Sequence, residues 1–258
     1  MTNKFKYFIG NWKMYGNLSS FKIIQNIEKY IKKNQNKFKK IKIIFCVPST
    51  LIYPFFLKFK KSKISIGGQN CHFSKNPGPF TGSLNAQMAK NVGAKYLILG
   101  HSENRKEGEN NHLINKKIEN ALCENLNVIF CFGETIEEKK RARTFQVIKK
   151  QINECIKKKF DLNKILFAYE PVWSIGSGKT PTINDLSKVI KFIKKYINKK
   201  YKFKKFKILY GGSVNAKNIE NFSKINEIDG FLIGGASLSQ KKFIDIINNY
   251  YKKPKWKL

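Results

Sequence analysis

The stretch from Tyr169 to Pro181 reads Tyr-Glu-Pro-Val-Trp-Ser-Ile-Gly-Ser-Gly-Lys-Thr-Pro. It follows an apolar run, Ile165 to Ala168, whose length and composition predict a buried β-strand. Glu170 therefore stands where this strand ends and a loop begins. A carboxylate at such a point is held rigidly by the strand and can still face a pocket, so Glu170 is the first candidate for a reactive acid or base.

The loop after Glu170 combines rigid and permissive residues. Pro171 restricts the backbone and Trp173 is bulky, whereas Gly176 and Gly178 let the backbone approach a ligand closely. This combination is typical of a lid that closes over a reactive group.

Short apolar runs recur along the chain, and we expect eight of them to form strands: Lys4 to Ile9, Ile41 to Val47, Ile64 to Ile66, Tyr96 to Leu99, Val128 to Phe132, Ile165 to Tyr169, Ile208 to Tyr210 and Gly230 to Ile233. Continuous apolar runs are typical of a parallel sheet that is covered on both faces. Stretches with helical spacing separate them, and three of these helices are expected to begin behind Ser19, Thr144 and Asp185. This order predicts an α/β fold, a single-domain (β/α)8 barrel over residues 1–258.

The composition limits the class of protein. With 258 residues and 41% hydrophobic content, the chain can bury one large core. Its apolar runs are shorter than the roughly 20 residues of a membrane helix, so we expect a cytoplasmic protein without membrane contact. The five cysteines show no Cys-x-x-Cys spacing, and we expect buried free thiols rather than a metal site or disulfides: Cys46, Cys71, Cys123, Cys131 and Cys155.

The formal net charge of +34 could indicate a nucleic-acid-binding protein. However, only three of the 51 basic residues are arginines, although proteins that grip phosphate backbones favour arginine for its bidentate geometry. The lysine runs at 157–159, 194–200 and 202–207 fall where helices would face water. We therefore expect solvated lysine faces and no specific nucleic-acid site, with only salt-sensitive attraction to polyanions.

Polar residues stand after several of the expected strands. Catalytic groups of a (β/α)8 barrel come from the C-terminal ends of its strands. Six candidates follow strands one, four, five and six, and we expect them to converge on one rim: Asn11, Lys13, His101, Glu103, Glu134 and Glu170.

Glycines near the same rim indicate an anion site built from backbone N–H groups. Gly176 lies in the lid, Gly211-Gly212-Ser213 follows strand seven, and Gly234-Gly235 follows strand eight, with a short helix expected at Ala236-Ser237. The sequence has no metal-ligand spacing and no dinucleotide fingerprint, so we expect acid-base chemistry without a metal or cofactor.

Taken together, these motifs resemble the triosephosphate isomerase family. The resemblance covers almost the whole chain and rests on the lid motif after Glu170, Asn11-Trp12-Lys13, Gly100-His101-Ser102-Glu103, Tyr210-Gly211-Gly212-Ser213 and Gly234-Gly235. It implies a homodimeric isomerase of glycolysis and gluconeogenesis. Such an enzyme interconverts dihydroxyacetone phosphate and glyceraldehyde 3-phosphate through an enediolate.

The resemblance also implies roles for single residues. Glu170 would move the proton, His101 would polarise the substrate carbonyl as a neutral imidazole, and Lys13 would hold the phosphate and the developing negative charge. Asn11 would position Lys13, and Glu103 would be its acidic neighbour. The phosphate would lie at Gly176, Ser213, Gly234 and Gly235. The lid would hinge at Pro171, Val172 and Trp173 and at Lys179, Thr180 and Pro181, with Glu134 and Tyr210 as its contacts.

Pro181 departs from the family pattern, in which the trailing hinge usually reads Lys-Thr-Ala. The family's tyrosine at the position of Tyr210 contacts the backbone amide of that alanine, and proline has no N–H. We therefore expect either that Ser213 and other contacts hold the lid, or that the lid opens sooner. In both cases Tyr210→Phe should have little effect on turnover.

A second departure concerns the subunit interface. The family usually has Thr-Gly-Glu and Ser-Glu-Arg where this chain has Thr81-Gly82-Ser83 and Ser102-Glu103-Asn104. The missing Glu and Arg commonly pair across the dimer, and losing both avoids an unpaired buried charge. Thr81 is retained and would reach Asn11 of the other subunit, so we expect a homodimer. The basic tail at 252–258 is either a frayed end or a docking segment anchored by Trp256.

Two other functions remain open at this point. Another barrel isomerase acting on a phosphorylated sugar would share the phosphate site. A polyanion-binding barrel without activity would instead need arginine clusters and stacking aromatic residues on one face, and neither is evident in the sequence.

Overall fold

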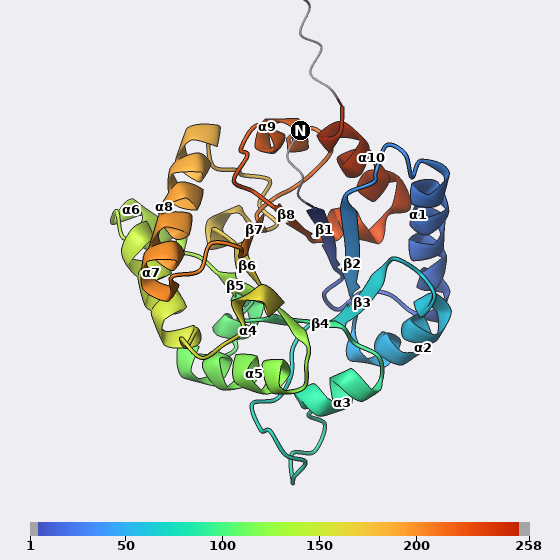
Figure 1. Cartoon of the computed structure of the whole chain (residues 1–258), viewed down its shortest axis with the longest axis horizontal. Helices are drawn as coiled ribbons and strands as arrows, with labels where there is room; N and C mark the ends of the chain where they lie inside the picture. Colours follow the sequence, from blue (N-terminus) through green and yellow to red (C-terminus); the bar gives the residue numbers. More distant parts are fainter. Residues whose placement is uncertain (1–4, 253–258) are drawn as a thin grey trace, which may run out of the picture.

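Eight parallel strands close into a barrel in which every strand pairs with its two neighbours along the chain, and β8 returns to β1. The computed structural model describes residues 5–252. Figure 1 shows the strands at the centre of the molecule. Their bounds are β1 Lys6–Asn11, β2 Ile41–Cys46, β3 Ser65–Gly68, β4 Tyr96–Leu99, β5 Asn127–Phe132, β6 Ile165–Tyr169, β7 Lys207–Tyr210 and β8 Gly230–Ile233.

Helices form an outer ring around this barrel (Figure 1). The α-helices are α1 Phe21–Lys33, α2 Ser49–Phe59, α3 Ala86–Asn91, α4 Ser102–Lys106, α5 Asn111–Cys123, α6 Ile136–Lys140, α7 Thr144–Cys155, α8 Ile183–Tyr201, α9 Ile219–Ser223 and α10 Gln240–Tyr250. The described part of the chain also contains four short 3-10 helices: η1 Leu18–Ser20, η2 Leu162–Lys164, η3 Val172–Ser174 and η4 Gly235–Leu238. The single-domain (β/α)8 barrel expected from the sequence is confirmed.

The core has two layers because each strand is buried on both faces. On β6, Leu166 and Ala168 belong to the cluster inside the barrel, whereas Ile165, Phe167 and Tyr169 pack in the layer under the helices. A strand buried on both faces carries apolar residues at successive positions. This explains why the strands appear in the sequence as continuous runs. Within residues 5–252, no helix is both long and apolar enough to cross a membrane.

The start of α8 differs from the sequence-based expectation. The helix begins at Ile183, and Thr182 caps it by accepting a hydrogen bond from the backbone N–H of Asp185. Asp185 therefore lies inside the first turn, where its negative charge interacts favourably with the positive end of the helix dipole. The other two expected starts lie within two residues of the observed ones, Phe21 and Thr144.

The cysteines and the lysines differ in part from what the sequence predicts. All five cysteines are free, and four are buried, but Cys123 at the end of α5 is exposed. Among the lysines, Lys117 is not solvated: its side chain is 8% exposed and pairs with Glu109. The runs at 157–159 and 202–206 lie mainly in loops rather than on helices. Of the basic tail, residues 253–258 lie outside the described residues.

Candidate active site

A cavity of about 550 Å³ opens at the C-terminal ends of the strands. Eight of the nine residues expected to act in catalysis or phosphate binding line this cavity, all except Glu103: Asn11, Lys13, His101, Glu170, Gly176, Ser213, Gly234 and Gly235. They come from segments far apart in the sequence. The barrel topology brings them together because all parallel strands end at the same rim.

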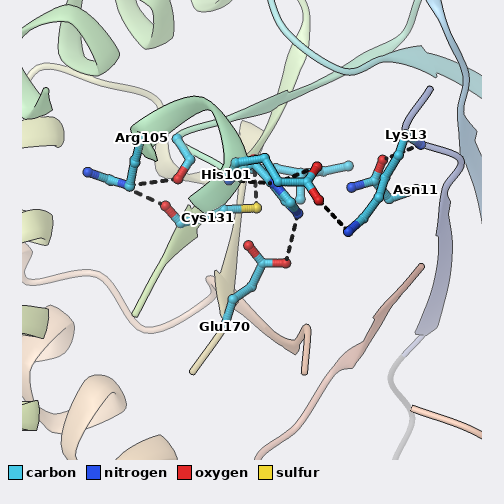
Figure 2. Close-up of polar contacts among 9 residues, drawn as sticks. Asn11, Lys13, His101, Arg105, Cys131 and Glu170 are labelled. Carbon is cyan, nitrogen blue, oxygen red and sulfur yellow. Dashed lines mark hydrogen bonds and ion pairs between the residues drawn. The ribbon is translucent and has the colours of Figure 1, made fainter. Parts of the chain in front are cut away.

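Glu170 is fixed at the exit of β6. Its backbone N–H donates to the carbonyl of Phe132 at 2.8 Å, and its side chain is 4% exposed. Oε1 lies 3.8 Å from Nε2 of His101, as Figure 2 shows, whereas Oε2 is buried and has no hydrogen-bond partner. A buried carboxylate oxygen without a partner is costly. The unpaired Oε2 therefore indicates that Glu170 is positioned to interact with a ligand.

Two glycines, whose role the sequence did not reveal, provide the space around Glu170. A Cβ at Gly211 would stand 2.6 Å from Glu170 Cγ, and a Cβ at Gly133 would stand 1.9 Å from the Glu170 carbonyl oxygen. Any side chain at either position would displace the carboxylate or the strand end. These glycines serve close packing and need no unusual backbone angle.

Burial raises the pKa of Glu170, and the nearby His101, Cys131 and Lys13 only partly oppose this effect. Glu103 behaves in the opposite way: burial works against ionisation, but the hydrogen bond from Lys13 and the nearby basic groups lower its pKa. The pKa values of these two carboxylates are thus shifted in opposite directions. Glu170 is suited to accept a proton, whereas Glu103 remains a fixed negative charge.

This difference can be measured directly. In protein labelled with ¹³C at glutamate side chains, Glu170 should titrate above the ordinary glutamate value of about 4.3, and Glu103 should titrate below it. Spectra of Glu170→Gln and Glu103→Gln assign the two resonances. A Glu170 midpoint at or below the ordinary value would contradict the proposed tuning.

His101 caps the short helix α4, and its ring orientation follows from this position. Nδ1 accepts a hydrogen bond from the backbone N–H of Glu103 at 3.2 Å, so in the neutral ring the proton is on Nε2. Nε2 faces Glu170, and the side chain is 5% exposed. His101 therefore presents one N–H donor to the cavity. This is the arrangement needed to polarise a carbonyl oxygen.

The backbone around His101 is held by Arg105, whose importance the sequence did not reveal. Its guanidinium donates from Nε to the Gly100 carbonyl at 2.7 Å and from Nη2 to the Cys131 carbonyl at 3.4 Å (Figure 2). Gly100 has φ +76°, an angle that favours glycine. Arg105 thus ties the ends of β4 and β5 together beneath the imidazole.

Lys13 has an unusual backbone. Its φ is +51°, which costs energy for a residue with a side chain, and the Asn11 side chain stabilises this turn by accepting the Lys13 backbone N–H at 3.1 Å. The ammonium lies 2.6 Å from Glu103 Oε1. The Lys13 side chain is 26% exposed, so the pair is not deeply buried. The strained turn directs the cation into the cavity.

The expected phosphate-binding residues divide into two groups. Gly234 and Gly235 line the cavity at the start of η4, and the nearest atom to a Cβ at Gly234 would be Lys13 Cε at 3.9 Å. Ser213 also lines the cavity, but its hydroxyl donates to the Ser174 carbonyl at 2.6 Å and its backbone N–H donates to Ser174 Oγ at 3.2 Å. In this structure Ser213 is therefore a lid contact.

Glu134 lies behind the lid and not in the central cavity. Its carboxylate accepts hydrogen bonds from the Trp173 indole at 3.0 Å and from the Tyr169 hydroxyl at 3.1 Å. Its carbonyl accepts the Val172 backbone N–H, and Lys139 stacks on the Trp173 ring at 3.6 Å. A second cavity of about 270 Å³ is lined here by Glu134, Trp173 and Pro181. Glu134 thus holds the leading hinge.

Tyr210 is fully buried, and its hydroxyl lies 3.1 Å from the hydroxyl of Ser174. Pro181 offers no amide to this tyrosine, and the sequence does not show that the Ser174 hydroxyl takes this place. Ser174 was missed because its partners lie 36 and 39 positions away along the chain. Pro181 lines the second cavity, and Thr180 and Lys179 precede it on the exposed side of the lid.

Across residues 5–252, no group of three or more His, Cys, Asp or Glu side chains is placed to hold a metal ion. Thr81, the remaining predicted site residue, is exposed on the loop between β3 and α3. Figure 1 shows this loop projecting beyond the ring of helices and away from the barrel.

Comparisons with known proteins agree with this site. The family model for triosephosphate isomerase matches residues 6–250. Triosephosphate isomerase of Zygosaccharomyces bailii is 40% identical over 245 residues, covering 93% of this chain and 96% of the yeast protein. The enzyme of Dictyoglomus thermophilum is 38% identical over 250 residues, covering 95% and 99%.

A solved structure is similar as well. The crystal structure of triosephosphate isomerase from Bartonella henselae superposes with a TM-score of 0.87 at 33% identity, covering 96% of this chain and 99% of that one. The closed barrel, the convergent site and these matches over nearly the full length lead to one conclusion. The chain belongs to the triosephosphate isomerase family.

Proposed function

We propose that this chain interconverts dihydroxyacetone phosphate and D-glyceraldehyde 3-phosphate by proton transfer, using the residues of the central cavity. Lys13 and the loops at Ser213, Gly234 and Gly235 bind the phosphorylated substrate. Glu170 removes the proton from the carbon next to the carbonyl, and Nε2–H of His101 donates to the carbonyl oxygen. Lys13 stabilises the negative charge that develops on the resulting enediolate.

The reaction ends when Glu170 returns the proton to the neighbouring carbon, while the hydroxyl proton passes from one oxygen of the enediolate to the other, so that the former carbonyl oxygen becomes the hydroxyl and the former hydroxyl oxygen becomes the carbonyl. The aldehyde and the ketone are isomers, so the electron pair stays within the substrate and no external oxidant or reductant is required. The same carboxylate serves both steps, which suits a group whose pKa is raised by burial. Asn11 and Glu103 position the Lys13 ammonium.

One observation carries this proposal. The unpaired Oε2 of Glu170 is buried in a cavity that His101 and Lys13 also line, so a base, a donor and a cation surround one small space. A substrate carbon placed there would satisfy the orphan oxygen through its acidic proton.

The direct experiment is an assay of the purified protein with each triose phosphate, using a coupled readout for the product. We expect conversion in both directions to one equilibrium ratio. Glu170→Gln, purified in parallel by the same protocol, excludes activity carried over from the expression host. Absence of turnover by folded wild-type protein would reject the proposal.

We further propose that the chain acts as a homodimer through the loop between β3 and α3. Exposed apolar side chains gather on this loop and on α3: Phe73, Phe80, Leu84 and Met88. His72 packs against Phe73 and Phe80, with ring centroids 4.2 and 4.3 Å away, so the three rings form one cluster. A projecting apolar loop is the kind of surface that a partner subunit covers.

The dimer proposal predicts the result of sedimentation. At micromolar concentration we expect a species of twice the chain mass, and Phe80→Asp should shift it toward monomer because a carboxylate would be buried at the interface. Glu107→Gln, on an exposed residue of another loop, serves as control. A fully active wild-type monomer at micromolar concentration would contradict the proposal.

The net charge of +34 predicts a salt effect on catalysis. A positive field attracts an anionic triose phosphate, so kcat/KM should fall by roughly threefold or more between about 10 mM and 150 mM sodium chloride. The turnover number at saturating substrate should change much less, because encounter no longer limits the rate. A kcat/KM that is independent of ionic strength would show that the charge does not steer the substrate.

The ends of the described chain meet in the barrel. We propose that the chain is one domain, because β1 and β8, from opposite ends of the described residues, pair directly and close the barrel. We also propose that it acts in the cytoplasm as a glycolytic enzyme, which its five free thiols support.

A further inference from the structure

The hydroxyl of Ser174 lies at the centre of the lid contacts. Ser174 ends η3 at the leading side of the lid and is fully buried. Its Oγ donates to the Lys179 carbonyl at 2.6 Å, accepts the Ser213 backbone N–H at 3.2 Å and lies 3.1 Å from the Tyr210 hydroxyl. A serine hydroxyl has only one O–H with which to donate, and here it donates to the Lys179 carbonyl oxygen. Tyr210 must therefore be the donor to Ser174.

These contacts join three segments at one oxygen atom. Ser174 belongs to the leading side of the lid, Lys179 to the trailing side, and Tyr210 and Ser213 to the end of β7 and the loop that follows it. Gly212 leaves room for this arrangement, since a Cβ there would stand 2.3 Å from the Tyr210 hydroxyl and 2.6 Å from Ser174 Oγ. Only glycine at this position permits the two hydroxyls to meet.

The tip of the lid has little packing of its own. Gly176 and Gly178 both have positive φ, are exposed, and would have open space around an added Cβ. The tip nevertheless lines the central cavity. Its position above Glu170 must therefore be fixed from the two sides of the lid, and Pro181 has no N–H with which to contribute.

We propose that Ser174 is a positioning residue for catalysis: its hydroxyl fastens both sides of the lid to the end of β7 and so holds the lid over the reacting substrate. This inference rests on the proposed isomerase function. Ser174 does not line the central cavity, and it acts through Tyr210, Ser213 and Lys179. Its hydroxyl replaces the amide that Pro181 cannot supply to Tyr210.

A loosened lid has a chemical consequence that a general loss of structure does not have. An enediolate phosphate exposed to water can expel its phosphate group: the C–O bond to phosphate breaks, the electron pair leaves with phosphate, and the remaining enol rearranges to methylglyoxal. Excluding water and holding the phosphate in place suppress this side reaction. The ratio of phosphate released to isomer formed therefore reports lid position and does not depend on how much of the protein is folded.

Ser174→Ala is the first test variant. We expect kcat/KM to fall about tenfold, as for the loss of one buried hydrogen-bonded group, and the ratio of released phosphate to isomer to rise at least tenfold. Ser177→Ala is the matched control, because the Ser177 hydroxyl bonds only within the lid, to Trp173 and Lys179. The control should keep its ratio within about twofold of wild type.

Tyr210→Phe tests whether Ser174 acts through the tyrosine. Alone it should lower kcat/KM about threefold, because Ser174 keeps its bonds to Lys179 and Ser213. This value refines the small effect expected from the sequence. In the double variant, Tyr210→Phe should lower kcat/KM by less than about a further twofold relative to Ser174→Ala alone. The reason is that it removes the tyrosine hydroxyl that Ser174→Ala leaves unpaired.

The outcomes are separable. The positioning role would be overturned if the losses of kcat/KM in Ser174→Ala and Tyr210→Phe multiplied in the double variant. It would also be overturned if the phosphate-to-isomer ratio of Ser174→Ala equalled that of wild type. If Ser174→Ala does not fold, the ratio measured for Tyr210→Phe alone decides, and a value equal to wild type would equally overturn it. Inactive wild-type protein would instead reject the proposed isomerase function, so the two failures cannot be confused.

Discussion

Glu170→Gln lowers kcat by about 10³- to 10⁴-fold, which is the largest effect we expect from a single substitution. A positioned general base contributes up to about 10⁴-fold, and here one carboxylate both removes and returns the proton. Glutamine has nearly the same shape but cannot accept the proton. The measurement is steady-state turnover of glyceraldehyde 3-phosphate by the variant and by wild type.

The control for this substitution is Glu107→Gln. Glu107 is exposed near the end of α4, outside the cavity, and its loss of charge equals that of Glu170→Gln. We expect this control to keep wild-type activity. If Glu170→Gln retained more than about a tenth of wild-type turnover, Glu170 would not be the base.

The same variant should also be more stable than wild type. The pKa of Glu170 is raised in the folded state, so the folded protein binds this proton more tightly than the unfolded chain does. The contribution of Glu170 to stability is therefore greatest below its unfolded pKa and declines as pH rises through the folded value. At pH 7 the buried charge is destabilising, and Glu170→Gln should raise Tm while it removes activity.

Lys13→Met has the second largest expected effect, a fall of about 10²- to 10³-fold in kcat/KM. The ammonium faces both the phosphate site and the atoms that become negative in the transition state, and one such electrostatic group is typically worth this much. Methionine is unbranched and keeps much of the side chain's length. The backbone strain caused by the φ of +51° at this position is therefore no greater for methionine than for lysine.

Because the chain is rich in lysine, a matched control is available. Lys22→Met removes one charge from the exposed surface of α1 and should leave kcat/KM nearly unchanged. The comparison separates the local role of Lys13 from the general positive field. A Lys13→Met variant within tenfold of wild type would place the electrophilic stabilisation elsewhere.

Much of the barrel could be predicted because its strands are buried on both faces. β4, β6 and β8 begin and end where the apolar runs do. β3 was placed too early, since its last two residues are Gly67 and Gly68, which do not resemble a strand. Glycine is needed there because a Cβ at Gly67 would stand 2.8 Å from the Tyr96 carbonyl oxygen. That requirement comes from a neighbouring strand and leaves no local pattern.

The site could be predicted where a residue ends a strand or follows it within two positions. Asn11, His101 and Glu170 follow this rule, and their meeting at one cavity needs only the barrel topology. Contacts that depend on tertiary packing could not be predicted. Nothing near Ser174 in the sequence points to Tyr210, and Lys117, which is buried against Glu109, looks like any other lysine.

Isomerisation in D₂O tests the account's central claim most directly, which is that one buried carboxylate moves a proton through a site that also polarises the carbonyl. The chain is supplied with glyceraldehyde 3-phosphate, and the product is examined by ¹H NMR for deuterium on the carbon that was the aldehyde. We predict dihydroxyacetone phosphate that carries deuterium at that carbon, and product that forms about 10³-fold or more slowly with Glu170→Gln. Product that forms at the wild-type rate without deuterium, or that forms with Glu170→Gln at more than about a tenth of the wild-type rate, would contradict the account.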